Sequence, residues 1–255
     1  MHEGAYCLDT ETTGLIEPQV IEVAHIRLSD GLEFYQRYKP TKAISFGAMA
    51  VHGIIDNDLI DCPPTGEYLL PFDCRYIIGH KVSFDVNAIG LSEIALDNIK
   101  VIDTLPLAQM IFNDLDSYTQ LACLYRINKT LARELASGAH NALKDARMNT
   151  LLFVHICQTI GTDDLDLIYE LAERSRIPEK MRSGKYIGVK CIDLPKRFKE
   201  WYQDKGEADK FVIAAMNGAK HMTLDEAKEI AAKAKEQNQA GKWSISNVME
   251  LLAEK

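Results

Sequence analysis

The sequence predicts an α/β fold in which helices flank a mixed five-stranded sheet, followed by a small C-terminal module and a helical tail. Three observations predict it. The chain opens with three strand-like segments separated by turn signals, continues with two short buried strands that alternate with helical segments, and then has helical periodicity from 118 to 174. Antiparallel strands followed by strand, helix, strand and helix are typical of a mixed sheet with helices on its faces.

Each element has a local signal. β-branched residues and short apolar runs mark the strands, and the turn signal Ser29-Asp30-Gly31 separates the second from the third. The strands are expected at 4–9, 20–28, 32–38, 75–80 and 100–103. The helices are expected at 84–95, 104–112, 118–126, 130–137, 142–160 and 164–174.

The pattern changes near Ile177-Pro178, and we place a boundary there between a first domain, 1–173, and a small basic module, 174–220. A helix at 196–203 falls within this module. Its tryptophan, Trp201, is expected in the core, because so small a module has few large apolar side chains.

Residues 221–255 are expected to form a helical tail of unknown role. A helix at 223–236 begins with Thr223 and Glu226 at capping-box spacing, and a last helix is expected at 246–254. The tail is a candidate site for a protein partner.

Charge is distributed unevenly along the 255 residues. The whole chain carries a net charge of −8, but 1–173 carries −13, 174–205 carries +6 and 206–255 carries −1. An acidic domain can gather carboxylates around divalent cations, and a basic segment attracts a polyanion such as nucleic acid. A solvated basic face explains the same segment equally well.

Composition excludes several classes of protein. With 47% apolar and 26% charged residues, the chain is neither disordered throughout nor membrane-spanning, since no apolar run reaches the length of a span. Its start lacks the basic flank and apolar core of a secretion signal. Six scattered cysteines form no CxxC pair, so neither a zinc site nor a disulfide framework is expected. We expect a cytoplasmic protein.

Two carboxylates stand at the end of the first expected strand, in Asp9-Thr10-Glu11-Thr12-Thr13-Gly14. Because side chains alternate along a strand, Asp9 and Glu11 project from the same face. They repel each other and raise each other's pKa unless a cation lies between them, and Mg²⁺ or Mn²⁺ prefers such oxygen ligands. For Asp-x-Glu alone, a pair of solvated charges is the commoner explanation. The residues that follow favour a turn that exposes backbone N–H groups.

Three further polar residues stand near the starts of expected helices. Asp85 falls in a first helical turn, where the helix dipole favours a negative charge. On one helix His140 and Asp145 would point about 140° apart, so they converge only if His140 lies in the preceding loop. A loop histidine beside carboxylates suits a general base. Taken singly, the first is read as a helix-capping aspartate and the histidine as a surface residue.

Together, in this order and at the ends of successive elements, these residues are specific. They resemble the DEDDh branch of the 3′–5′ exonucleases, whose fold is ribonuclease H-like. The motifs are Asp9-Thr10-Glu11-Thr12-Thr13-Gly14, Gly47-Ala48-Met49-Ala50-Val51-His52-Gly53-Ile54, Phe84-Asp85 and His140-x-Ala142-x-x-Asp145-Ala146. The resemblance covers about 1–160. The segment from Ser183 to Tyr202 resembles the small C-terminal module of bacterial exonuclease X proteins.

The resemblance implies a two-metal hydrolysis. Two divalent cations, Mg²⁺ or Mn²⁺, would be held by Asp9, Glu11, Asp85 and Asp145, and His140 would take the proton of the attacking water. All five are expected to be catalytic. The expected substrate is the 3′ end of single- or double-stranded DNA, and the expected product is a nucleoside 5′-monophosphate.

Six residues are candidates to contact the substrate: Thr12, Thr13, Met49, His52, Phe84 and Lys81. Backbone groups of the two threonines would hold the terminal 3′-OH, and Met49, His52 and Phe84 would contact the last bases. Met49 serves equally well as plain core. Lys81 stands where the family usually has asparagine, and its cation is placed to contact a phosphate.

Two other functions use the same features. An exoribonuclease that trims RNA is the first alternative, because nothing in the sequence recognises the 2′-OH decisively. DNA is preferred because the segment from Val51 to Ile54 and the C-terminal module resemble DNA-acting relatives. A polymerase-associated proofreading or binding module is the second, although a binding module has no need of five intact catalytic residues.

Overall fold

The computed structural model describes residues 2–90, 98–112, 114–136, 141–206 and 208–237. Five strands form one sheet in the order β3-β2-β1-β4-β5. β1 pairs antiparallel with β2, and β2 with β3, whereas β4 pairs parallel with both β1 and β5. The predicted mixed five-stranded sheet is therefore confirmed. The strands are β1 Ala5–Thr12, β2 Val20–Arg27, β3 Glu33–Arg37, β4 Tyr76–Gly79 and β5 Lys100–Asp103.

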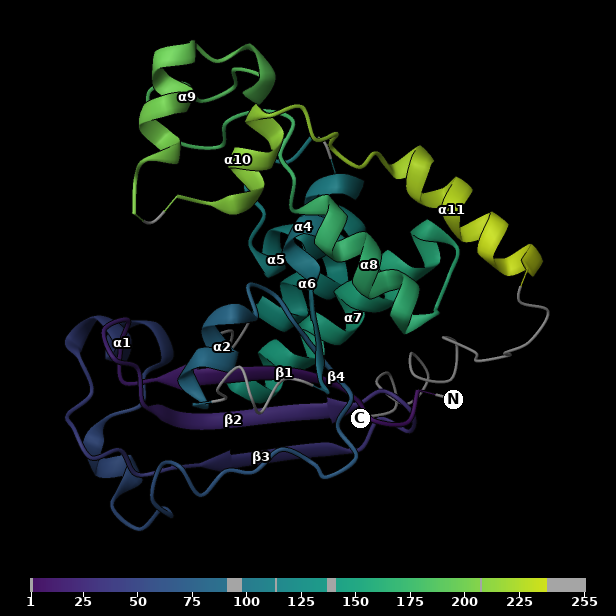
Figure 1. Ribbon diagram of the computed structural model, residues 1–255. Helices are drawn as coiled ribbons and strands as arrows, with labels where there is room; N and C mark the ends of the chain where they lie inside the picture. Colours follow the sequence, from purple (N-terminus) through teal and green to yellow (C-terminus); the bar gives the residue numbers. More distant parts are fainter. Residues whose placement is uncertain (1, 91–97, 113, 137–140, 207, 238–255) are drawn as a thin grey trace.

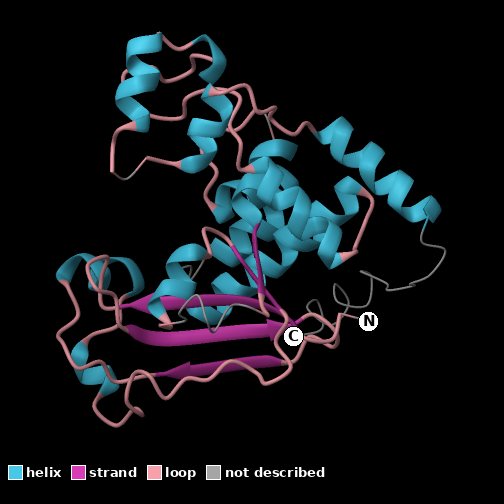
Figure 2. Cartoon of the chain, in the orientation of Figure 1, coloured by secondary structure: helices cyan, strands magenta, loops and turns pink. Residues whose placement is uncertain are grey.

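Helices cover the sheet and continue into the module (Figure 1; Figure 2). Those that follow the predicted pattern are α2 Ser83–Ala88, α4 Thr104–Ile111, α5 Gln120–Ile127, α6 Lys129–Ala136, α7 Ala142–Ile160, α8 Leu165–Ser175, α9 Lys196–Gln203 and α11 Leu224–Gln237. Further helical segments are α1 Phe46–His52, η1 Asp56–Leu59, η2 Cys191–Asp193 and α10 Lys210–Met216. Propensity over 210–216 did not single out α10, which Asp209 caps by accepting from the Phe211 amide at 2.8 Å.

The main core lies between the sheet and α7. The first half of β1 is apolar and most of β2 is apolar, and both strands are largely buried. The long helix α7 packs against them through fully buried side chains that include Leu152, Phe153 and Ile156. This packing brings the first turn of α7 to the end of β1, and so fixes two distant segments beside each other.

The C-terminal module has a small core of its own. Met181, Cys191, Leu194, Ala215 and Met216 form it. α8 packs against α4 of the first domain and runs to residue 175, two residues beyond the expected domain end at 173. Contrary to expectation Trp201 lies outside this core and is 58% exposed, because the five buried side chains fill the interior and leave the indole at the surface of the module.

The described part of the tail packs on the first domain. Met222, Ala227 and Ala231 belong to the main core, where α11 lies against α7. The helix expected at 246–254 lies outside the described residues. Within the described ranges, the structure contains no helix with the length and apolar character needed to cross a membrane.

Candidate active site

Three carboxylates meet where β1 ends. Asp9 and Glu11 project from one face of β1, as strand alternation predicts, and Asp145 reaches them from the first turn of α7. One ligand oxygen from each lies within 4.8 Å of the others. Asn141 caps α7 by accepting from the Lys144 amide at 3.3 Å, which sets the direction of this turn. Hard oxygen donors at this spacing suit a divalent cation.

The electrostatics of this cluster support the same conclusion. Burial and the charge of Asp145 raise the pKa of Glu11 to about 8. Burial, followed by the charges of Asp85, Asp145 and Glu11, raises the pKa of Asp9 well above its usual value. The cluster is therefore strained when all its members are ionised, and a bound cation would remove that strain. The residues present thus fit a metal site.

Asp85 lies beside the three carboxylates but is not one of them. It is buried on α2, and its Oδ1 accepts from the Thr10 amide at 2.9 Å and from Thr10 Oγ1 at 2.7 Å. Burial raises the pKa of Asp85 to about 7. The side chain of Thr10 points to the face of β1 opposite Asp9 and Glu11. Its two hydrogen bonds therefore hold Asp85 against the end of β1 from that opposite face. Sequence reasoning missed this role of Thr10.

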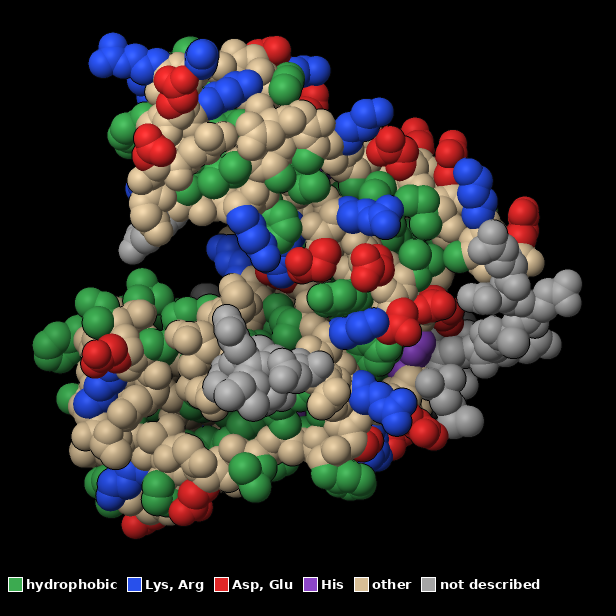
Figure 3. Space-filling view, in the orientation of Figure 1, with side chains coloured by type: hydrophobic (Ala, Val, Ile, Leu, Met, Phe, Trp, Pro, Cys, Tyr) green, Lys and Arg blue, Asp and Glu red, His purple; other side chains and the backbone are tan. Residues whose placement is uncertain are grey.

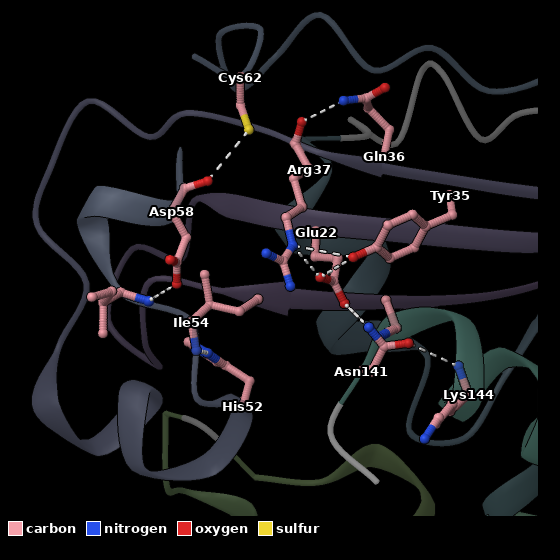
Figure 4. A network of polar contacts seen from close by, with 12 residues as sticks. Glu22, Tyr35, Gln36, Arg37, His52, Ile54, Asp58, Cys62, Asn141 and Lys144 are labelled. Atoms are coloured by element: carbon pink, nitrogen blue, oxygen red, sulfur yellow. Dashed lines mark hydrogen bonds and ion pairs between the residues drawn. The ribbon is translucent and has the colours of Figure 1, made fainter. Parts of the chain in front are cut away.

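Glu22 on β2 is a second residue that sequence reasoning missed. It is fully buried, and Figure 4 shows four donors around its carboxylate. Oε1 accepts from Asn141 Nδ2 at 3.0 Å and from the Ala142 amide at 2.8 Å. Oε2 accepts from Tyr35 Oη at 2.7 Å and from Arg37 Nε at 2.8 Å. Glu22 thus joins the sheet to the start of α7. The sequence signal that could have identified Glu22 is a single acidic residue within an otherwise apolar part of a strand.

His140 lies outside the described residues. The two residues that follow it are both held by Glu22, and Asp145 begins the same helix. The described chain on the C-terminal side of the histidine is therefore tied to the sheet beside the carboxylates.

The two threonines that follow Glu11 form hydrogen bonds within the fold. Thr13 is buried, its amide donates to the Gln19 carbonyl at 2.9 Å, and its Oγ1 accepts from the Gln19 amide at 3.1 Å. Its backbone N–H is thus already used within the fold, and contact of Thr13 with a substrate stays a prediction. Thr12 is also buried, and its hydroxyl donates to the Gly14 carbonyl at 3.2 Å.

The other candidate contacts lie on α1 and α2. Met49 is half-buried against the small cluster around Ile54, which favours a packing role. His52 Nδ1 accepts from the Ile54 amide at 3.0 Å. Phe84 is half-buried beside Asp85. Base contact by these residues stays a prediction.

Lys81 has a backbone conformation that asparagine adopts more readily. Its φ is +61°, in the left-handed region, where asparagine is favoured over lysine. Its amide donates to Asp103 Oδ1 at 3.0 Å, and its side chain is exposed. The substitution therefore retains the turn and adds a cation at the surface.

Apolar side chains missed by the sequence reasoning flank the site. Leu15, Ile16 and Phe46 are 85%, 84% and 89% exposed. They lie on neighbouring segments, because the Ser45 amide donates to the Thr13 carbonyl at 2.9 Å. Such surfaces suit contact with nucleobases.

The sheet and its acidic cluster define an exonuclease with a ribonuclease H-like fold. The family model described as "Exonuclease", the RNase T type, matches residues 6–153. The chain belongs to this family and is a 3′–5′ exonuclease of the DEDDh type, a hydrolase of phosphodiester bonds.

The relatives come from two groups. DNA polymerase III subunit epsilon of Buchnera aphidicola (Acyrthosiphon pisum strain) is 32% identical over 184 residues, which cover 62% of this chain and 73% of the relative. The Escherichia coli K12 subunit is 31% identical over 192 residues, 64% and 74% of the two chains. A solved structure, exonuclease X in complex with 5′ overhanging duplex DNA, matches with a TM-score of 0.50 and 26% identity over 62% of this chain and 93% of that one.

Proposed function

We propose that the chain is a metal-dependent 3′–5′ exodeoxyribonuclease that releases nucleoside 5′-monophosphates from DNA 3′ ends. The observation that carries the proposal is the convergence of Asp9, Glu11 and Asp145 oxygens within 4.8 Å of one another. DNA is favoured as the substrate because the similar proteins are subunits of a DNA polymerase and a nuclease bound to duplex DNA. Residues 1–173 would perform the chemistry.

Two divalent cations, Mg²⁺ or Mn²⁺, would supply activation of water and neutralise charge that develops on the phosphate. Asp9, Glu11 and Asp145 would hold them. Asp85 would complete the ligand set with the carboxylate oxygen that Thr10 does not bind. The raised pKa values of Glu11 and Asp9 reflect the burial and mutual repulsion of their ionised carboxylates, which bound cations would offset.

The remaining roles fall to residues around the carboxylates. His140 would accept the proton of the attacking water, and Glu22 would hold the chain that follows it. Leu15 and Phe46 would contact the terminal bases, and the exposed side chain of Lys81 would bind a phosphate of the DNA.

Digestion of end-labelled substrates tests the proposal. Single- and double-stranded DNA and RNA of one sequence are compared with Mg²⁺, Mn²⁺ or EDTA, and the released products are identified. We expect nucleoside 5′-monophosphates from the 3′ end, loss of activity in EDTA, and inactive Asp9→Ala and Asp145→Asn proteins. Asp61→Asn, which changes an exposed carboxylate outside the acidic cluster, should retain activity. Activity of Asp9→Ala in EDTA would contradict the metal assignment, and preferred digestion of RNA would establish the exoribonuclease alternative.

Polymerase-associated proofreading is a second candidate, favoured by the epsilon subunits among the relatives. It predicts a stable complex with the catalytic subunit of a replicative DNA polymerase from the same organism. Co-elution of the two purified proteins in gel filtration would support it, and separate elution at micromolar concentration would count against it.

A further inference from the structure

The C-terminal module contains a cavity that the catalytic chemistry does not use. It lies between the segment 176–186 and helices α9 and α10. Its volume of about 620 Å³ falls within the range of roughly 300–1,000 Å³ that is usual for ligand sites. A ligand of nucleotide size therefore fits.

The cavity volume of about 620 Å³ is enclosed on one side by aromatic rings. Phe198 is at the centre of this wall, with its ring centroid 4.6 Å from Tyr186, 5.4 Å from Trp201 and 6.0 Å from Tyr202. Tyr186, Phe198 and Tyr202 also pack on the module core, whereas Trp201 is 58% exposed and does not. An exposed indole in the wall of a cavity offers a face on which a flat ring can stack.

Positive charge also lines the cavity. Arg182, Lys185 and Lys205 line it, and none of them forms an ion pair with an acid among the described residues. The one acidic side chain in the lining, Asp209, caps α10 and offsets part of the charge of Arg182. The cations outnumber this acid, so the lining carries a net positive charge and would attract an anionic ligand.

Contacts connect this cavity to the loop that precedes Asp85. Arg176 lines the cavity, and its Nη2 lies 3.9 Å from Asp103 Oδ2. The other oxygen of Asp103 accepts from the Lys81 amide at 3.0 Å, and Lys81 lies two residues before the first residue of α2. Figure 3 shows a hollow between the module and the part of the first domain that carries α1 and α2, with Lys and Arg side chains at its inner end. A strand whose 3′ end occupies the active site can thus continue toward the cavity.

We propose that this cavity binds a nucleotide of single-stranded DNA on the 5′ side of the residue that is cleaved. The base stacks on Trp201, and its phosphates are bound by Arg182, Lys185 and Lys205. The strand is single, because a base must be released from its pair before it stacks on a side chain. This inference rests on the proposed function, since it assumes that the active site degrades DNA.

Tryptophan fluorescence and matched charge variants test the proposal in the full chain. The protein carries Asp9→Asn to prevent digestion and Trp243→Phe so that Trp201 is the only tryptophan, and it is titrated with a 20-nucleotide oligo(dT). We expect saturable quenching of the Trp201 fluorescence. Arg182→Gln should bind about tenfold more weakly in the same titration. Trp201→Ala should also bind about tenfold more weakly, as measured by the anisotropy of a labelled oligonucleotide. Trp201→Phe retains a ring and should recover part of the affinity.

Arg197→Gln is the control, because it removes the same charge from α9 outside the cavity lining. Its dissociation constant should stay within about twofold of the parent value, since the phosphate contacts are made elsewhere. Equal weakening by Arg197→Gln and Arg182→Gln would overturn the proposal in favour of diffuse charge, and so would unchanged Trp201 fluorescence at saturation. Tighter binding of oligo(rU) than of oligo(dT) would overturn the assignment to DNA.

The parent enzyme with Mg²⁺ on labelled DNA separates the two levels of inference. Absence of cleavage there would refute the proposed function. Cleavage by the parent enzyme, combined with unchanged DNA binding by the cavity variants, would refute the cavity assignment alone. Thermal melting of each variant by circular dichroism shows that the module is folded.

Discussion

The Ala142 amide donates a hydrogen bond of 2.8 Å to Glu22 Oε1, across 120 residues of sequence. The same carboxylate accepts from Arg37 on β3, so one buried side chain joins two strands to the start of α7. Asp145 lies in the first turn of that helix, and His140 precedes it. The position of Glu22 therefore sets where Asp145 meets the end of β1.

Glu22→Gln is expected to lower kcat about tenfold to a hundredfold with little change in KM. Each oxygen of Glu22 accepts two of the four hydrogen bonds, so an amide nitrogen in place of either one opposes two donors and loosens the link between the sheet and the start of α7. Glu33→Gln is a matched control, because Glu33 also joins the sheet to α7, through Arg147 at 2.8 Å, but farther along the helix. Steady-state kinetics and thermal melting measure the two effects. Equal kcat values in the two variants would show that Glu22 only stabilises the fold.

Metal binding should change how the stability of the protein depends on pH. In the folded, metal-free protein the pKa of Glu11 is raised to about 8 from its usual 4.5, so its folded form keeps a proton that the unfolded form has lost. Its contribution to stability is present below about pH 4.5 and is lost as pH rises toward 8. In EDTA, Glu11→Gln should therefore gain Tm relative to the parent as pH rises from 5 to 8. Saturating Mg²⁺ should abolish this gain, and a gain that is constant with pH would contradict the prediction.

His140→Ala should reduce the maximal rate by about 10²–10⁴-fold, the usual contribution of a positioned general base. The concentration of Mg²⁺ that gives half-maximal activity should stay nearly unchanged, because the base is not expected to bind the metal. Titration of activity with Mg²⁺ measures both quantities. A normal maximal rate with a large rise in the metal requirement would instead identify His140 as a ligand.

Lys81 combines a strained backbone with an exposed cation, and two variants separate these properties. Lys81→Asn should raise stability by roughly 0.5–1 kcal/mol, because asparagine tolerates a φ of +61° better than lysine. Lys81→Gln should give no such gain. Both should raise the KM for DNA and lower its dependence on salt, because both remove one cation. Identical KM values at low salt for the parent and both variants would exclude a phosphate contact.

The residues that sequence reasoning placed correctly are those governed by local periodicity. Asp9 and Glu11 share a face because strand side chains alternate, and Asp145 falls in the first turn of a helix that a capping asparagine begins. Glu22 and Thr10 act through partners 75 to 120 residues away, which no local pattern specifies. Their roles follow only from the packing of α2 and α7 around β1.

In the module and the tail, local sequence patterns did not predict how the elements pack. Composition favoured a buried Trp201, but the small core of the module is filled by methionine, leucine, alanine and cysteine, and the indole lies outside it. The amphipathic helix α11 had no visible partner in the sequence. Its buried alanines pack on the first domain, so the fold of residues 1–173 is covered by a segment that follows the module.

This packing predicts that α11 stabilises the catalytic domain. Ala227 is fully buried between α11 and α7, and Ala227→Glu would place a carboxylate in an apolar contact. We expect a loss of about 1–3 kcal/mol of unfolding free energy, limited by undocking of α11, and faster hydrogen exchange in α11 and the facing turns of α7. Lys228→Glu changes the charge of the neighbouring, exposed position and should have little effect. Equal stability of the two variants would show that α11 rests on the domain without contributing to its stability, and the chain could then be shortened to the end of the module without loss.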